Sequence, residues 1–136
     1  MFGASDAAVD EVRREETAAI RPQSVGYSTR DQVLATLLAQ KFLIVDNRMA
    51  LKGACSSDVE RVAVAQAYNS AADQYQAALS KAHIVNDGEV LQNIDGMKAI
   101  QDQIQDAIDQ AAAIGQILND IASSLQMGSK IITLMV

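Results

Sequence analysis

The side chains that most often carry out acid–base or metal chemistry are sparse in this sequence. His83 is the single histidine and Cys55 the single cysteine among the 136 residues. A zinc site within one chain needs several such groups close together, and a lone cysteine cannot form an internal disulfide. We expect His83 to be an ordinary residue near a helix C-terminus, and Cys55 to be a free thiol in a turn between helices.

Aspartates recur along one side of the last third of the chain. Asp95, Asp102, Asp106 and Asp109 follow spacings of 7, 4 and 3 residues, which places them on one helix face. Such a row could hold a divalent cation between subunits, act as paired catalytic carboxylates or dock a basic partner, but it is most often a solvated face. The stretch 85–89 has residues typical of calcium loops without their alternating ligands or closing Glu. We therefore predict that the protein is not an enzyme and that it has no catalytic residue, metal site, cofactor or small-molecule substrate.

Composition and charge limit the class further. Hydrophobic residues make up 49% of the chain, and the net charge is -6. This combination excludes a chain that is disordered throughout, and the acidic balance argues against a nucleic-acid partner or an anionic membrane surface. The first residues lack the pattern of a signal peptide, and the longest apolar run, 33–45, is too short to span a bilayer and is interrupted by Thr36, Gln40 and Lys41. We expect a cytoplasmic location or one within a large assembly; export without a cleavable signal and membrane contact at the C-terminus stay open.

Start and stop signals divide the chain into an N-terminal segment, 1–27, and a helical bundle, 28–136. A short helix is predicted over 5–20, followed by a linker. Ser28 and Ser57 open the next two helices as N-caps with an acidic residue three positions later. These helices run to about Gly53 and about Ala82, and the second of them has a seam made mostly of alanine.

The last helix is predicted to be the longest. It follows the turn at Asn86 and continues for about 40 residues, or about 60 Å. Apolar side chains recur along it at alternating steps of four and three, which is the pattern of a coiled-coil seam. The positions of this seam are Val90, Ile94, Met97, Gln101, Ile104, Ile108, Ala111, Gly115, Leu118, Ala122 and Leu125.

The predicted fold class is all-α: an elongated helical bundle or coiled coil of three long helices plus a short N-terminal helix. The two middle helices, about 36 and 40 Å long, would form a hairpin that covers about two thirds of the last one. Apolar residues beyond its reach would face water, and such surface usually marks a protein interface. The predicted interface residues are Ile114, Ile117, Leu118, Ile121, Leu125, Ile131, Ile132, Leu134, Met135 and Val136.

These features favour a non-enzymatic structural or assembly subunit, as in a bacterial secretion, conjugation, phage or virion assembly. It would self-associate, or pack on related chains, through its long C-terminal helix. The alternative is a soluble chaperone, adaptor or inhibitory partner that binds one client protein through the 114–136 surface. The first function predicts a homo-oligomer or a larger complex, and the second a monomer or small oligomer until the client arrives.

Overall fold

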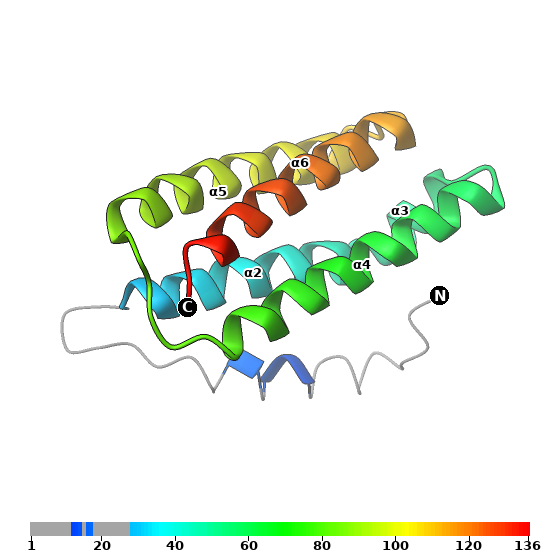
Figure 1. Cartoon of the computed structure of the whole chain (residues 1–136). Helices are drawn as coiled ribbons and strands as arrows, with labels where there is room; N and C mark the ends of the chain where they lie inside the picture. Colours follow the sequence, from blue (N-terminus) through cyan, green and yellow to red (C-terminus); the bar gives the residue numbers. More distant parts are fainter. Residues whose placement is uncertain (1–11, 15, 18–27) are drawn as a thin grey trace.

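The computed structural model describes residues 12–14, 16–17 and 28–136 (Figure 1). The linker predicted before residue 28 lies outside these residues, as does most of the helix predicted over 5–20; residues 12–14 and 16–17 are helical. Two of them contact the bundle. Glu16 accepts a hydrogen bond from Lys41 Nζ at 2.7 Å, and the Arg13 guanidinium lies 4.4 Å from the centre of the Phe42 ring.

From Thr29 onward the structure contains five helices and no strand, so the all-α prediction is confirmed. Ser28, Ser57 and Asn86 act as N-caps, because each side chain accepts a hydrogen bond from the backbone N–H three residues later, at 3.1, 3.2 and 3.1 Å. The helices are α2 (Thr29–Asp46), α3 (Arg48–Ala54), α4 (Asp58–Leu79), α5 (Asp87–Asp109) and α6 (Ile114–Thr133).

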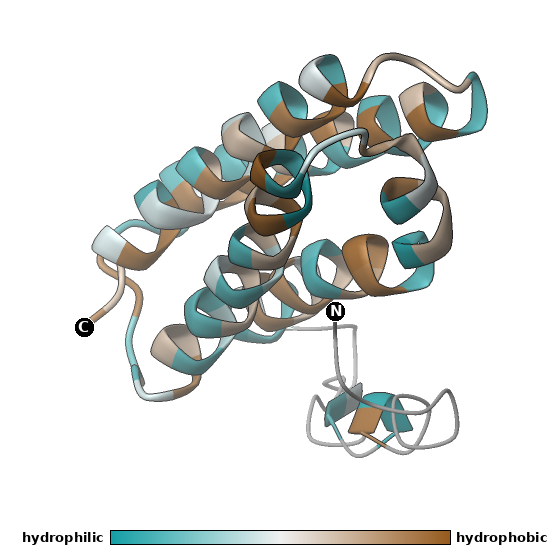
Figure 2. Ribbon diagram, turned by 90° about the vertical axis from the view of Figure 1, so that its right-hand side faces the viewer, coloured by the Kyte–Doolittle hydropathy of each residue, from teal (hydrophilic) through white to brown (hydrophobic). Residues whose placement is uncertain are grey.

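The four long helices form a bundle of two antiparallel hairpins, α2 with α4 and α5 with α6, in which α2 runs parallel to α5 and α4 runs parallel to α6. α2 packs against α4 and α5, and α6 packs against the same two helices, so that α2 and α6 lie at opposite corners (Figure 1). The buried side chains of the helices are mostly apolar, with Thr36, Gln40, Gln74 and Ser124 as polar exceptions. Figure 2 shows hydrophobic and hydrophilic residues alternating along the helices. We call the end that carries α3 and the turn 110–113 the turn end, and the end that carries the C-terminal residues 134–136 the tail end.

The core consists of two apolar clusters, one toward each end. The tail-end cluster combines the first half of α2, the last turns of α4, the first half of α5 and the last turns of α6, with Tyr75 and Met97 among its buried residues. The turn-end cluster combines the end of α2, Leu51 of α3, the start of α4, the end of α5 and the start of α6. Every long helix therefore contributes to both clusters.

The prediction of one long C-terminal helix is wrong. The chain turns at residues 110–113, so that α5 and α6 have 23 and 20 residues and lie side by side. The predicted seam is buried as far as Ile104, but beyond the turn Ile117 and Ile121 are buried instead of Leu118 and Ala122. The physical reason is that folding back lets α6 bury its broad apolar face within its own chain.

Two smaller predictions also fail. The helix expected to run to Gly53 breaks at Asn47, whose Nδ2 donates to Leu43 O at 2.7 Å and to Gln105 Oε1 at 2.9 Å. The alanine seam expected on α4 is shifted by part of a turn. Of the expected seam residues Val62, Ala65, Ala72, Ala78 and Leu79, only Ala78 is fully buried and Val62 is exposed. The buried row is Val64, Ala67, Ala71, Gln74, Tyr75 and Ala78.

Candidate functional site

The predicted interface residues lie largely inside the chain's own core. Five of them, Ile114, Ile117, Ile121, Ile131 and Met135, are at most 8% exposed. Four more are half-buried, and one is exposed: in chain order these are Leu118, Leu125, Ile132, Leu134 and Val136. The prediction assumed a straight last helix, whose far end would have exposed apolar surface. Because α6 folds back along α5, most of that surface is buried within the chain.

The tail end is closed by backbone pairing between residues 82–85 and 134–136. The N–H groups of Ala82 and His83 both donate to Val136 O at 3.0 Å, and Val136 N–H donates to His83 O at 2.8 Å. Val85 N–H donates to Leu134 O at 2.8 Å. His83 lies beyond the end of α4, and its exposed position in this connection differs from the helix C-terminus expected from the sequence.

Two long basic side chains add to this closure. Arg30 of α2 donates from Nε to Lys81 O at 2.8 Å and from Nη2 to Leu79 O at 3.0 Å. These carbonyls belong to the last residue of α4 and to the connection just after it, where no intrahelical N–H remains to bind them. Lys81 Nζ donates to Met135 O at 3.2 Å, and the Met135 side chain is only 1% exposed. The tail thus completes the core of its own chain.

A buried layer of polar side chains separates the two apolar clusters. Gln40 Nε2 donates to Gln74 Oε1 at 2.8 Å, and Ser124 Oγ donates to Gln40 Oε1 at 2.7 Å. Gln74 Nε2 donates to Leu125 O at 2.7 Å and to Ser129 Oγ at 3.1 Å. The layer ties α2, α4 and α6 together, and such satisfied buried groups specify one arrangement of helices more than they add stability.

Gly128 makes this layer possible. A Cβ at this position would overlap Gln74 Oε1 and would lie 2.9 Å from Gln74 Cδ. The sequence did not predict this layer: Gln40 stood out only as one of three polar residues that interrupt the apolar run 33–45. Gln74 and Ser124 gave no signal, since isolated Gln and Ser residues are typical of helix surfaces.

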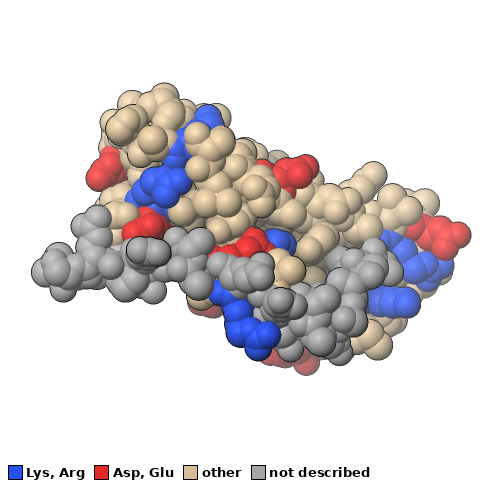
Figure 3. All heavy atoms as spheres, turned by 90° about the horizontal axis from the view of Figure 1, so that it is seen from below, with Lys and Arg blue, Asp and Glu red and all other residues tan. Residues whose placement is uncertain are grey.

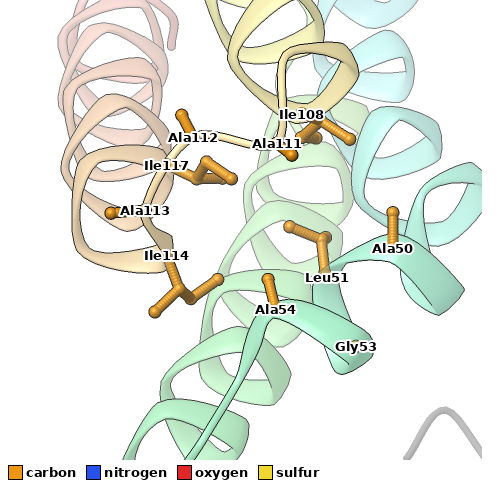
Figure 4. Close-up of a pocket in the computed structure, with 10 residues that line it drawn as sticks. All are labelled: Ala50, Leu51, Gly53, Ala54, Ile108, Ala111, Ala112, Ala113, Ile114 and Ile117. Carbon is orange, nitrogen blue, oxygen red and sulfur yellow. The ribbon is translucent and has the colours of Figure 1, made fainter.

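A pocket of about 450 Å³ opens at the turn end, between α3, the end of α5 and the start of α6. All of its lining residues are Ala, Gly, Leu or Ile. Figure 4 shows Leu51 and Ala54 of α3 opposite Ile114 and Ile117 of α6. The sequence did not predict this pocket, because it exists only where the chain turns between α5 and α6.

Further apolar side chains are exposed near the pocket. Met49 of α3 is 75% exposed, and Val59 and Val62 in the first turns of α4 are 80% and 53% exposed. α3 and the start of α4 lie at the same end of the bundle (Figure 1). The turn end therefore presents apolar side chains to water both inside the pocket and beside it.

The turn itself is built from alanines. Ala111 has a φ of 54°, the only positive value at a non-glycine residue of the described chain. Ala112 N–H donates to Ala107 O at 2.9 Å and Ala111 N–H to Ile108 O at 3.0 Å, which is the hydrogen-bond pattern of a Schellman helix ending. Glycine usually fills the left-handed position of this ending, and Ala113 begins α6 without a side-chain cap.

A metal ion would need a cluster of titratable groups close together. The described residues contain no group of three or more His, Cys, Asp or Glu that could hold a metal ion. Asp95, Asp102, Asp106 and Asp109 lie on the exposed face of α5. On the face that Figure 3 shows, acidic and basic side chains are scattered in small groups.

Two groups near the start of α4 have shifted pKa values: Cys55 at the end of α3 and Glu60 in the first turn of α4. Cys55 is a free, half-buried thiol that donates to Leu51 O at 3.2 Å, and burial, reinforced by the charge of Glu60, raises its pKa. The pKa of Glu60 is lowered, because its carboxylate accepts hydrogen bonds from the Ser56 N–H at 2.7 Å and the Ser56 hydroxyl at 3.0 Å. Both shifts follow from local helix-end geometry.

No family model, curated protein or solved structure matches this chain. None of the helices from Thr29 onward is both long enough and apolar enough to cross a lipid bilayer. The turn end combines the apolar pocket with the exposed side chains of Met49, Val59 and Val62.

Proposed function

We propose that this chain is a non-enzymatic structural or assembly subunit that self-associates, or packs on related chains, through its C-terminal helical hairpin. The contact is placed at the turn end. The observation that carries the proposal is the pocket of about 450 Å³ lined entirely by apolar residues, with Met49, Val59 and Val62 exposed nearby. Its function would be geometric, because a rigid bundle sets the distance between its neighbours in a secretion, conjugation, phage or virion assembly.

The energetic basis is the removal of apolar surface from water. Covering about 600 Å² of such surface gains up to about 15 kcal/mol before the entropy of association is subtracted. Because no charged residue lines the pocket, an apolar side chain from a partner could enter it without desolvating an ion. The tail end also exposes two apolar side chains, Val85 and Val136, at 67% and 65%, but its backbone groups and Met135 are already engaged within the chain.

Mass-resolved light scattering over a tenfold range of concentration tests this proposal. The native chain should show a mass above that of the monomer at the upper end of the range. Ala54→Glu places a charge on the exposed rim of the pocket and should shift the protein to monomer. Ala99→Glu, the same change on the exposed face of α5, should not.

Either of two results would contradict the proposal. A native chain that stays monomeric throughout would remove self-association, and equal association of Ala54→Glu and Ala99→Glu would remove the turn end as its location. The circular dichroism of both variants must match that of the native chain, so that a loss of mass reports on contact and not on folding.

A second function, a chaperone, adaptor or inhibitory partner for one client protein, is favoured by the same pocket. Its volume lies within the usual range of about 300–1,000 Å³ for sites that hold apolar groups. Ile114 and Ile117 line it, so part of the 114–136 surface would meet the client. This function predicts a monomer at every concentration and a complex only when the client is added.

A further inference from the structure

The residues of the turn between α5 and α6 locally prefer a helix, although the chain turns there. Its sequence, Gln110 followed by Ala111, Ala112 and Ala113, contains neither Gly nor Pro, and alanine is the strongest helix former. Ala111 nevertheless has a φ of 54°, a left-handed conformation that disfavours alanine relative to glycine about fivefold or more. The hairpin is therefore held by the burial of α6 and not by the turn.

A straight chain through this turn would form one continuous apolar stripe. Ile104 is buried and belongs to the apolar seam with spacings of four and three residues. The same spacing continues through Ile108, Ala111, Gly115 and Leu118. In the folded hairpin this stripe is interrupted, since Ala111 and Gly115 are exposed. In a continuous helix these small residues would let a second helix cross closely at that point.

We propose that α5 and α6 can join into one continuous helix over 87–133, and that two copies of this chain exchange α6 by this opening. Each α6 then lies between α4 and α5 of the other copy, and every contact that it makes in the monomer is remade between chains. Monomer and dimer differ only at the turn, which is the usual condition for domain swapping through a strained hinge. The inference rests on the proposed self-association and changes its mode: because Ala111, Ala112 and Ala113 line the pocket, opening the turn rearranges it, and the contact between copies is then the exchanged α6.

The buried polar layer indicates that a second copy, and no unrelated helix, fills the vacated place. A helix there must supply a hydroxyl to Gln40 and must accept hydrogen bonds from Gln74 Nε2. It must also carry a glycine where Gln74 approaches, as Gly128 does. Only a helix with this spacing avoids leaving buried amides without partners.

Cross-linking between copies tests the exchange. Ser70 of α4 and Gln126 of α6 are exposed residues that line one shallow groove. One population carries Ser70→Cys and another Gln126→Cys, both with Cys55→Ser, which retains a donor toward Leu51 O. After refolding together at high concentration, a short bis-maleimide should join the two populations into a covalent dimer. Refolding each population alone should give no such product.

Substitutions at the hinge residue Ala111 test whether the cross-linked dimer forms by opening of the turn. Ala111→Gly relieves the left-handed strain in the hairpin and weakens the continuous helix, and each dimer contains two hinges. The dissociation constant of the dimer should therefore rise about 1,000-fold. Ala122→Gly, at an exposed position that is helical in both forms, should leave it unchanged.

The outcomes separate this inference from the proposed function. Dimers seen by light scattering that give no cross-link between populations, or that are insensitive to Ala111→Gly, would overturn the exchange and leave self-association intact. No dimer in any preparation would overturn both proposals. A cross-linked dimer that weakens with Ala111→Gly but not with Ala122→Gly supports the exchange.

Discussion

At the tail end, residues 134–136 pair with the α4–α5 connection through four backbone hydrogen bonds, whereas at the turn end three alanines lead from α5 into α6. The tail end also buries Met135 and uses Arg30 and Lys81 to bind free carbonyls. The turn end instead has an open apolar pocket and a residue in a disfavoured conformation. The tail end is fixed by backbone pairing and by a buried side chain. The turn itself keeps its conformation because α6 packs against the bundle.

The difference shows how tertiary burial can override a strong local preference. The left-handed conformation of Ala111 costs about 1–2 kcal/mol. Burying Ile114, Ile117 and Ile121 gains about 1.5–3 kcal/mol for each side chain, which is several times that cost. The hairpin is therefore more stable than the continuous helix in a single chain, but only because α6 packs against α4 and α5.

The largest effect should come from breaking the tail end. Deletion of residues 134–136 removes the backbone pairing and the buried Met135 side chain, so the free energy of unfolding should fall by about 4 kcal/mol or more. Urea unfolding followed by circular dichroism measures this change. Val136→Ala keeps the backbone pairing and should cost less than about 0.5 kcal/mol. A deletion variant as stable as the native chain would show that the tail does not fix this end.

The next largest effect on stability distinguishes Gly128 from Gly115, the two glycines of α6. Gly128→Ala places a methyl group against Gln74 and should lower the free energy of unfolding by about 2 kcal/mol. Gly115→Ala meets no atom within 4 Å and should raise it by about 0.5–1 kcal/mol through helix propensity. Chemical denaturation of the pair compares the same substitution at the polar layer and at the turn end. Equal effects would contradict the close fit of Gly128 against Gln74.

A smaller effect of opposite sign is expected at the turn. Ala111→Gly should raise the free energy of unfolding of the monomer by about 1 kcal/mol, because glycine adopts a φ of 54° without strain. Alanine-to-glycine changes elsewhere on these helices should lower it, as Ala122→Gly does by about 1 kcal/mol. Unfolding at low protein concentration measures both. If Ala111→Gly destabilises the chain to the same extent, the turn stores no strain.

The smallest effect concerns pH at the start of α4. The lowered pKa of Glu60 means that its carboxylate stabilises the fold above the ordinary value of 4.5, and that this contribution is lost as the pH falls through the lowered pKa. Glu60→Gln should therefore lower the melting temperature slightly at pH 7 and not at pH 3. Ser56→Ala removes one of the two donors and should give part of the same change. A difference that grows toward low pH would contradict the sign.

The parts of the fold that the sequence predicts are those encoded by neighbouring residues. The N-caps at Ser28, Ser57 and Asn86 were visible because each cap is defined by residues within one turn. The core face of α5 followed from its regular apolar spacing. The break at 110–113 had no signal, because glutamine and alanine favour the helix that the fold interrupts.

The candidate site was predicted less well for the same reason. The pocket and the polar layer both depend on α6 folding back, so neither could be expected from a straight helix. Ile114 and Ile117 were predicted as interface residues and do line the pocket, but the residues of α3 opposite them were not predicted. Only contacts between distant parts of the chain bring these residues together.

The distance between α5 and α6 within one chain tests the central claim most directly. Spin labels at Ala99→Cys and Ala122→Cys, with Cys55→Ser and an excess of unlabelled chain, report this distance by pulsed dipolar spectroscopy. In the monomer the labels should lie close together, because packed helix axes are about 8–10 Å apart. In the dimer fraction a distance of about 35 Å, that of 23 residues along one helix, is predicted. A dimer fraction with only the short distance would contradict the opening of the turn.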